Sequence, residues 1–163
     1  AENTGLTDKS VGLVTAAQAF HWFDEERFRT ECGRILTDNG KLAIIWYNDV
    51  KEGLAARQTE ICNKYCLDLI LNNGHAGKRS AEDGDKFLRG GYFTELTVEE
   101  FPGERIFDRE SFIGETLSRS YAHKPGQPYY EQLIDKLNAL FSEFESGGSA
   151  VVKTQTVCYL GSF

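Results

Sequence analysis

The sequence has no methionine, no long apolar run and no cluster of basic residues. No apolar stretch approaches the roughly 20 residues that span a bilayer, and no charged-then-apolar leader opens the chain. The formal charge is -7, from 18 basic and 25 acidic residues, so we expect no surface that binds nucleic-acid phosphates. These absences argue against membrane and nucleic-acid partners and favour a cytoplasmic protein that acts on small molecules.

A glycine-rich phosphate loop is also missing. The glycines cluster at residues 74–77, 90–91 and 147–148. None of these clusters follows an apolar strand and opens a helix with the spacing that a dinucleotide-binding loop needs. Together with the absent initiator methionine, this favours a fragment of a longer protein over a mature, processed one.

Four cysteines are present: Cys32, Cys62, Cys66 and Cys158. Cys62 and Cys66 lie four residues apart on a predicted helix and share one face. Two ligands without a matching His or Cys pair do not close a tetrahedral zinc site. We therefore expect no metal site and four small buried thiols, in agreement with a reducing cytosol.

Composition and periodicity predict one domain over residues 1–163. With 40% hydrophobic and 12% aromatic residues the chain can bury a core of about one domain, and no linker divides it. Strands are predicted at 11–16, 41–47, 93–101 and 151–160. Four helices are predicted: two that follow the N-caps Asp24 and Asp108, a long one over 54–73 and the most strongly periodic one over 130–144.

Turns and loops are predicted between these elements. Asp38-Asn39-Gly40 should form a turn, with Gly40 able to take a positive φ, and Pro102-Gly103 should form another. Residues 74–91 are polar and carry five glycines, so we expect a mobile loop there.

The order of residues 1–47 resembles a known family. Ala1-Glu2-Asn3 leads through a turn at 7–10 into the strand at 11–16, then a helix and the strand at 41–47. This order is similar to S-adenosylmethionine-dependent methyltransferases of the Rossmann-like class, and most to the type-11 subgroup, which includes trans-aconitate methyltransferase-like enzymes. A Ser-x-Ser-Tyr segment at 118–121, which recurs in that subgroup, agrees. Gly12 departs from the pattern, because the family usually has an acidic residue there.

The resemblance implies an α/β fold: the C-terminal half of a Rossmann-like methyltransferase sheet, with strands 4-5-7-6, an antiparallel last strand and inserted helices. Residues 1–163 would be a partial domain that lacks the N-terminal cofactor-binding half, with its glycine-rich loop and acidic ribose residue. Removing strands 1–3 would expose the strand at Val11–Ala16 as an apolar edge. We expect such an edge to recruit a partner, here by self-association of the fragment.

The resemblance also implies site residues. The expected cofactor is S-adenosyl-L-methionine, with Ala1 and Glu2 along the adenine and Ala17 at the methionine end, beside Gln18 and Ala19. Simple strand-end packing is an equally good interpretation of the two alanines that follow the strand. The candidates for lining the acceptor pocket are Trp22, Tyr47, Asn48 and Tyr121, although amphipathic packing explains each of them singly.

No catalytic residue is predicted. His21 can take a proton near neutral pH, but it has no carboxylate or nucleophile placed by spacing, and His75 and His123 lie in polar segments. Methyl transfer from a sulfonium needs mainly in-line positioning and exclusion of water. Two functions therefore remain: methyl transfer to a small-molecule acceptor by the intact parent, the isolated fragment being inactive, or a non-catalytic interaction or regulatory domain that keeps the fold.

Overall fold

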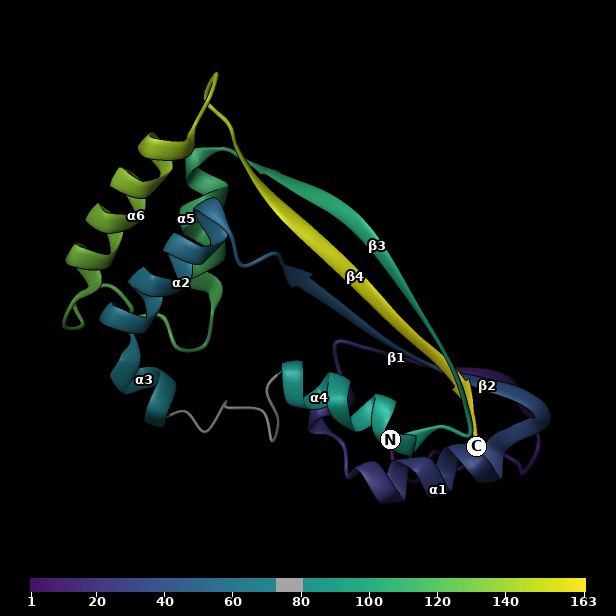
Figure 1. Cartoon of the computed structure of the whole chain (residues 1–163). Helices are drawn as coiled ribbons and strands as arrows, with labels where there is room; N and C mark the ends of the chain where they lie inside the picture. The colour runs from purple at the N-terminus through teal and green to yellow at the C-terminus, as the bar shows by residue number, and fades with distance from the viewer. Residues whose placement is uncertain (73–80) are drawn as a thin grey trace. The chain divides into compact units, whose positions relative to one another are not determined.

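The computed structural model describes residues 1–72 and 81–163, which form two compact units. The first unit comprises Ala1–Tyr47, the described part of Gly77–Phe101, and Thr156–Phe163. The second comprises the described part of Asn48–Ala76, and Pro102–Gln155. One open sheet contributes strands to both units (Figure 1).

The sheet has the order β1-β2-β4-β3, and the bounds of its strands are β1 Val11–Ala17, β2 Leu36–Asp49, β3 Glu95–Phe107 and β4 Ala150–Ser162. β1 and β2 are parallel, and β4 points opposite to β2 (Figure 1). β3 begins beside the end of β4, where the Thr94 N–H donates to the Ser162 carbonyl at 2.9 Å, so these two strands are antiparallel. The predicted order 4-5-7-6 is confirmed.

In the first unit, the buried face of one helix packs on the sheet. α1 (Glu25–Ile35) begins at its predicted cap, where Asp24 Oδ1 accepts from Arg27 N at 3.1 Å. Phe28 and Cys32 on this helix join Leu42 and Ile44 of β2 in one core. A 3-10 turn, η1 (Phe20–Trp22), connects β1 to α1 and contributes the buried ring of Phe20.

A loop was predicted for residues 74–91, and for the described residues 81–91 this prediction is wrong. α4 (Ala81–Phe87) continues into the π-helical turn η2 (Leu88–Tyr92), whereas residues 73–80 lie outside the described residues. Burial of Leu88 and Tyr92 in the first core stabilises this segment. Asp85 accepts hydrogen bonds from the Tyr159 hydroxyl of β4 and from Arg89 Nε, so α4 is also tied to the sheet.

The turn predicted at Asp38-Asn39-Gly40 is wrong, because these residues lie within β2, at an irregularity of the strand. The register shifts between the pairs Val11–Leu36 and Leu13–Lys41, which leaves extra residues on β2. Gly40 does not take a positive φ. Glycine is needed there for space, because a Cβ would lie 2.9 Å from both Leu36 Cδ2 and the Thr37 carbonyl oxygen.

Helices build the second unit around its own core. They are α2 (Gly53–Tyr65), α3 (Leu67–Asn72), α5 (Arg109–Ser118) and α6 (Tyr130–Phe144). α6 packs against α2 and α5 (Figure 1), and its buried residues include Leu133 and Leu137. The predicted cap of α5 is confirmed, since Asp108 Oδ1 accepts from Ser111 N at 2.8 Å.

Two further expectations for this unit are wrong. The helix predicted over 54–73 breaks at Cys66, whose φ of -123° and ψ of 11° lie outside the helical region. The turn predicted at Pro102-Gly103 is absent from the described chain, because β3 runs through it without a break. Proline is tolerated because β3 is an edge strand, where a missing N–H costs no ladder hydrogen bond.

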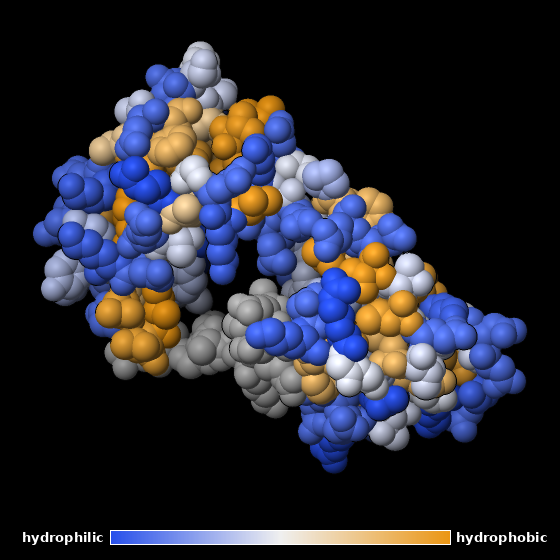
Figure 2. All heavy atoms as spheres, viewed as in Figure 1, coloured by the Kyte–Doolittle hydropathy of each residue, from blue (hydrophilic) through white to orange (hydrophobic). Residues whose placement is uncertain are grey.

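Apolar residues reach the surface in separate patches among hydrophilic ones (Figure 2). Leu13 of the edge strand β1 is 53% exposed, and Phe101 and Ile106 of β3 are also exposed. Among the helices within residues 1–72 and 81–163, none has the length and hydrophobicity of a membrane-crossing segment.

Candidate functional site

The candidate site lies where the parallel strands β1 and β2 end. Ala17, the last residue of β1, is paired with Ile45, so the carboxyl ends of both strands reach the same edge of the sheet. Ligands of open α/β sheets bind at this edge. Ala17 is exposed, so its methyl group is accessible and is not part of the described core.

Gln18 joins the two strand ends. Its φ of 51° is left-handed, which turns the chain sharply out of β1. Its backbone N–H donates to the Ile45 carbonyl at 3.0 Å, and its side-chain Nε2 donates to the Tyr47 carbonyl. The Gln18 amide is therefore held against β2, and the backbone beside Ala17 is fixed.

An aromatic cluster stands beside the strand ends. The His21 ring stacks on Trp46 with centroids 5.5 Å apart and an interplanar angle of 27°, and it lies 4.8 Å from the Trp22 ring. Trp22 is 61% exposed and Tyr47 is 40% exposed. Burial lowers the pKa of His21, so its imidazole is neutral at neutral pH and offers one acceptor nitrogen.

Phe20, the residue before His21 and Trp22, is buried in the core of the first unit. It is 3% exposed, and its ring centroid lies 5.4 Å from that of Tyr92, 6.1 Å from Phe28 and 6.4 Å from both Phe23 and Phe87. Because His21 and Trp22 follow it in η1, the buried Phe20 ring sets where these two side chains emerge.

The segment that carries Ala1 and Glu2 is tied to α1. Glu31 Oε1 accepts from Thr4 N at 2.8 Å and from Thr4 Oγ1 at 2.6 Å, while Arg34 Nε donates to Glu31 Oε2 at 2.9 Å. The Arg34 and Thr4 hydrogen bonds lower the pKa of Glu31 to about 2. The carboxylate is therefore charged at neutral pH and holds the segment in place.

Glu2 itself contacts the start of α1. Its Oε1 accepts from Asp24 N at 2.8 Å, and this bond, followed by that from the N-terminal amino group, lowers the pKa of Glu2 to about 2. Glu2 and Asn3 line a hollow of about 420 Å³ together with Arg27, Thr30 and Glu31.

The other two candidates lie in the second unit. Asn48 is exposed beside Asp49, which pairs with Arg105 at 2.6 Å. Tyr121 is half-buried, and its hydroxyl accepts from Arg119 Nη1 at 2.8 Å. The structure thus groups Ala17, Gln18, Ala19, Trp22 and Tyr47 in one unit, with Ala1 and Glu2 on the segment bound to α1.

Sequence reasoning missed Trp46, Glu31 and Arg34. The place of Trp46 just before Tyr47 at the end of an apolar strand was the available signal. Glu31 and Arg34 stand three apart on α1, as an ion pair on a helix face does. Nothing in the sequence indicated that Thr4 would complete their network.

The described cysteines have the chemistry of buried thiols. Cys32, Cys62 and Cys66 are buried, and Cys158 is half-buried. Burial raises the pKa of Cys32 to about 12 and that of Cys62 to about 11, so both are protonated at neutral pH and are poor nucleophiles. Within the described chain, no group of three or more His, Cys, Asp or Glu side chains could hold a metal ion.

Comparison with known proteins shows sequence similarity over the first part of the chain. Residues 1–44 match a family described as a methyltransferase domain. An uncharacterized methyltransferase of Schizosaccharomyces pombe is 54% identical over 41 residues, which cover 25% of this chain and 16% of that protein. An uncharacterized methyltransferase of Mycobacterium bovis is 44% identical over 46 residues, covering 28% and 19%. The chain thus matches less than a fifth of the length of these relatives.

A solved structure extends the likeness in fold to the remaining residues. A candidate type II methyltransferase from Anaeromyxobacter dehalogenans superposes with a TM-score of 0.62 at 21% identity, covering 99% of this chain and 68% of that one. At this identity the likeness concerns the fold. Residues 1–44 therefore match the methyltransferase domain family, and the chain shares the fold of the matching part of a solved methyltransferase structure.

Proposed function

We propose that this chain is the second half of an S-adenosylmethionine-dependent methyltransferase domain that acts on a small-molecule acceptor. The observation that carries the proposal is that the family match over residues 1–44 contains all five cofactor candidates: Ala1, Glu2, Ala17, Gln18 and Ala19. Coverage of 68% of the structural relative leaves room for a further part of the domain.

The strand ends suit the methionine end of the cofactor. Ala17 is exposed and small, and the left-handed turn at Gln18 directs the following chain away from it. A ligand can then approach the backbone closely at the carboxyl end of β1. The Ile45 and Tyr47 carbonyls that hold Gln18 keep this surface rigid.

The aromatic cluster suits a cationic or planar ligand beside Ala17. Trp22 is 61% exposed, and cations are attracted to aromatic ring faces, those of tryptophan most of all. When bound there, S-adenosylmethionine would supply an activated methyl group on a sulfonium, for transfer to an acceptor held in line with it. The rings would orient the acceptor and exclude water.

His21 is able to accept a proton in this setting, since burial lowers its pKa. Its packing against Trp22 and Trp46 favours a structural residue over a catalytic one. A carboxylate acceptor needs no base, so we assign no catalytic residue. Asn48 and Tyr121 stay predicted acceptor-lining residues, and a cytoplasmic location and a single partial domain over 1–163 stay predictions.

The test uses a longer protein that contains this chain and measures S-adenosylmethionine binding by isothermal titration. Ala17→Leu adds three carbons at the proposed contact, and we expect a loss of ~1 to 3 kcal/mol, or roughly ten- to a hundredfold in affinity. The matched control is Ala139→Leu, at another exposed alanine, on α6 in the second unit.

Three outcomes separate the alternatives. Weaker binding by Ala17→Leu alone supports the proposed site. Equal binding by both variants contradicts the placement at Ala17. If the unmodified protein binds no S-adenosylmethionine, the methyltransferase proposal is contradicted and the interaction or regulatory domain is favoured.

A further inference from the structure

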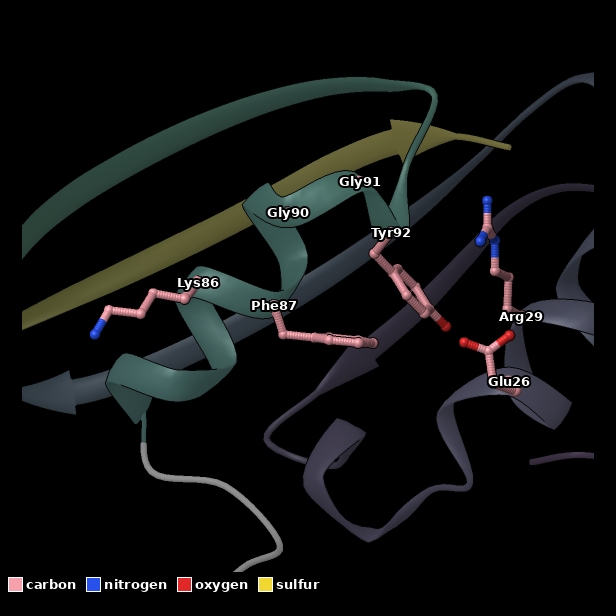
Figure 3. A pocket seen from close by; sticks show the side chains of 7 residues that line it. All are labelled: Glu26, Arg29, Lys86, Phe87, Gly90, Gly91 and Tyr92. Atoms are coloured by element: carbon pink, nitrogen blue, oxygen red, sulfur yellow. The ribbon is translucent and has the colours of Figure 1, made fainter.

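A hollow of about 520 Å³ separates α1 from the α4 and η2 segment of the first unit. It is lined by Glu26, Arg29, Lys86, Phe87, Gly90, Gly91 and Tyr92 (Figure 3). Its volume falls within the range of about 300 to 1,000 Å³ typical of small-molecule sites. None of its lining residues is among the cofactor or acceptor candidates.

Arg29 gives this hollow a positive wall. Its guanidinium carbon lies 5.6 Å from the centre of the Tyr92 ring and 5.4 Å from that of Phe163. Within the described chain its side chain has no hydrogen bond and no ion pair, whereas Arg34, Arg89 and Arg119 each pair with a carboxylate. The flat fork of Arg29 donors is therefore held by two rings and is available to a ligand.

The aromatic walls are fixed before any ligand arrives. Tyr92 is 3% exposed, and its hydroxyl donates to the Glu25 carbonyl at 3.0 Å. Phe87 lies 5.2 Å from it, centroid to centroid, and Figure 3 shows the two rings directed toward the same side of the hollow. The buried Tyr92 ring therefore backs the hollow, and a planar group can lie against the half-buried Phe87 ring at low entropic cost.

Two glycines leave the backbone open at the rim. An added Cβ at Gly90 or Gly91 would meet no atom within 4 Å, and Gly91 has a φ of 104°. Close approach of a ligand to the backbone favours glycine. The peptide groups of this turn are thus accessible from the hollow.

The charge of the lining favours an anion in a chain whose formal charge is -7. Arg29 and Lys86 are positive and Glu26 is negative. Between the described side chains of Arg29 and Glu26 there is no ion pair within 4 Å. In Figure 3 Lys86 points away from Arg29, so it would act on an approaching anion rather than contact a bound one.

We propose that this hollow is a second ligand site, for a small planar molecule that carries a carboxylate or phosphate group. The anion pairs with the Arg29 fork, whose geometry matches either group in a bidentate manner. The planar part lies against Phe87, with the buried Tyr92 ring behind it. Both rings also contact Phe20, so an occupant would touch the side chains that support η1.

The test is titration of ¹⁵N-labelled protein, followed by NMR at the amides of Gly90 and Gly91 and at Arg29 Nε–H. The probes are benzoate and phenyl phosphate, with benzamide as the neutral planar control and acetate and inorganic phosphate as anions without a ring. We expect the planar anions to shift these signals at lower concentration than any control. Which of the two binds more tightly identifies the anion.

Arg29→Gln should weaken binding of the planar anions at least about tenfold, the effect of losing one charge-assisted hydrogen bond. Arg27→Gln on the same helix, which does not line this hollow, should bind as the unmodified protein does. Arg29→Lys keeps the charge and should bind more weakly than arginine but better than glutamine, which separates recognition from loss of folding.

The proposal is overturned if neither planar anion shifts these signals, if benzamide binds as well as benzoate, or if Arg29→Gln binds normally. The readout contains no S-adenosylmethionine, so the result is independent of methyl transfer.

Discussion

Replacing Phe20 with alanine perturbs the ring that supports η1. Phe20 is 3% exposed and lies within 6.4 Å, centroid to centroid, of four aromatic rings. Truncation of a buried phenylalanine costs about 3 to 5 kcal/mol, and each aromatic pair contributes about 0.5 to 1.5 kcal/mol beyond burial. We expect a loss at the upper end of that range, because four pairs are lost together.

Tryptophan fluorescence is a suitable assay for this change. The sequence has two tryptophans, Trp22 and Trp46, and both lie in the first unit, so urea unfolding followed by fluorescence reports on that unit. Phe101→Ala is the control, since Phe101 is exposed in the same unit and should change the free energy of unfolding by less than about 0.5 kcal/mol. A loss below about 1 kcal/mol for Phe20→Ala would refute the anchoring role of Phe20.

Four other outcomes are expected. The pKa of Glu31 is lowered to about 2 from its ordinary 4.5, so the stabilisation by its carboxylate is complete above about pH 4.5 and is lost as the pH falls toward 2. The free energy of unfolding of Glu31→Gln, measured in urea, should therefore depend less on pH in that window. An unchanged pH dependence contradicts a stabilising role for the Glu31 hydrogen bonds to Thr4 and Arg34. Gly161→Ala places a Cβ 2.4 Å from the Glu95 carbonyl oxygen and should lower the free energy of unfolding in urea by about 1 to 3 kcal/mol or more. Gly12→Ala is the control and should lower it less, because the added Cβ has no atom within 4 Å. The open edge at β1 should make the 163-residue chain self-associate, and Leu13→Lys should reduce this in sedimentation velocity; a monomer at tens of micromolar before the change counts against it. The same chain should bind S-adenosylmethionine only weakly in a calorimetric titration, because it has no glycine-rich loop, and low-micromolar affinity, near -8 kcal/mol, contradicts that reasoning.

Local signals predicted the starts of α1 and α5 and the extent of α6. Asp24 and Asp108 were predicted as N-caps from residue type and the apolar stripes that follow, and both accept the expected backbone hydrogen bond. The strand order came from the family resemblance, since periodicity alone does not say which strands are neighbours. The periodic apolar residues over 130–144 also predicted α6.

The features that sequence reasoning missed depend on contacts between distant residues. The α4 and η2 segment is polar and rich in glycine, and its helical state depends on burial of Tyr92 and on the Asp85 bond to Tyr159, 74 residues away. Pro102 indicates a turn unless the strand is known to be at an edge. Local sequence carries none of this information.

The candidate site residues stay predictions, and the sequence did not show which of them lie together. Ala17 and Gln18 were assigned through the resemblance, and the structure places them at the end of β1 with Gln18 bonded to Tyr47, which was predicted for the acceptor side. The stacking of His21 on Trp46 joins residues 25 positions apart in sequence, and the spacing of aromatic residues does not indicate it.

Contact between S-adenosylmethionine and the methyl group of Ala17 is the most direct test of the proposed function. The measurement is an isotope-filtered NOE experiment on a longer protein that contains residues 1–163, with ¹³C-labelled alanine and unlabelled cofactor, and with Ala17→Gly to assign the signal. We predict an NOE from the cofactor's S-methyl or methionine methylene protons to the Ala17 methyl group. Tight binding of the cofactor without any NOE to Ala17 would contradict the placement of the site at the ends of β1 and β2.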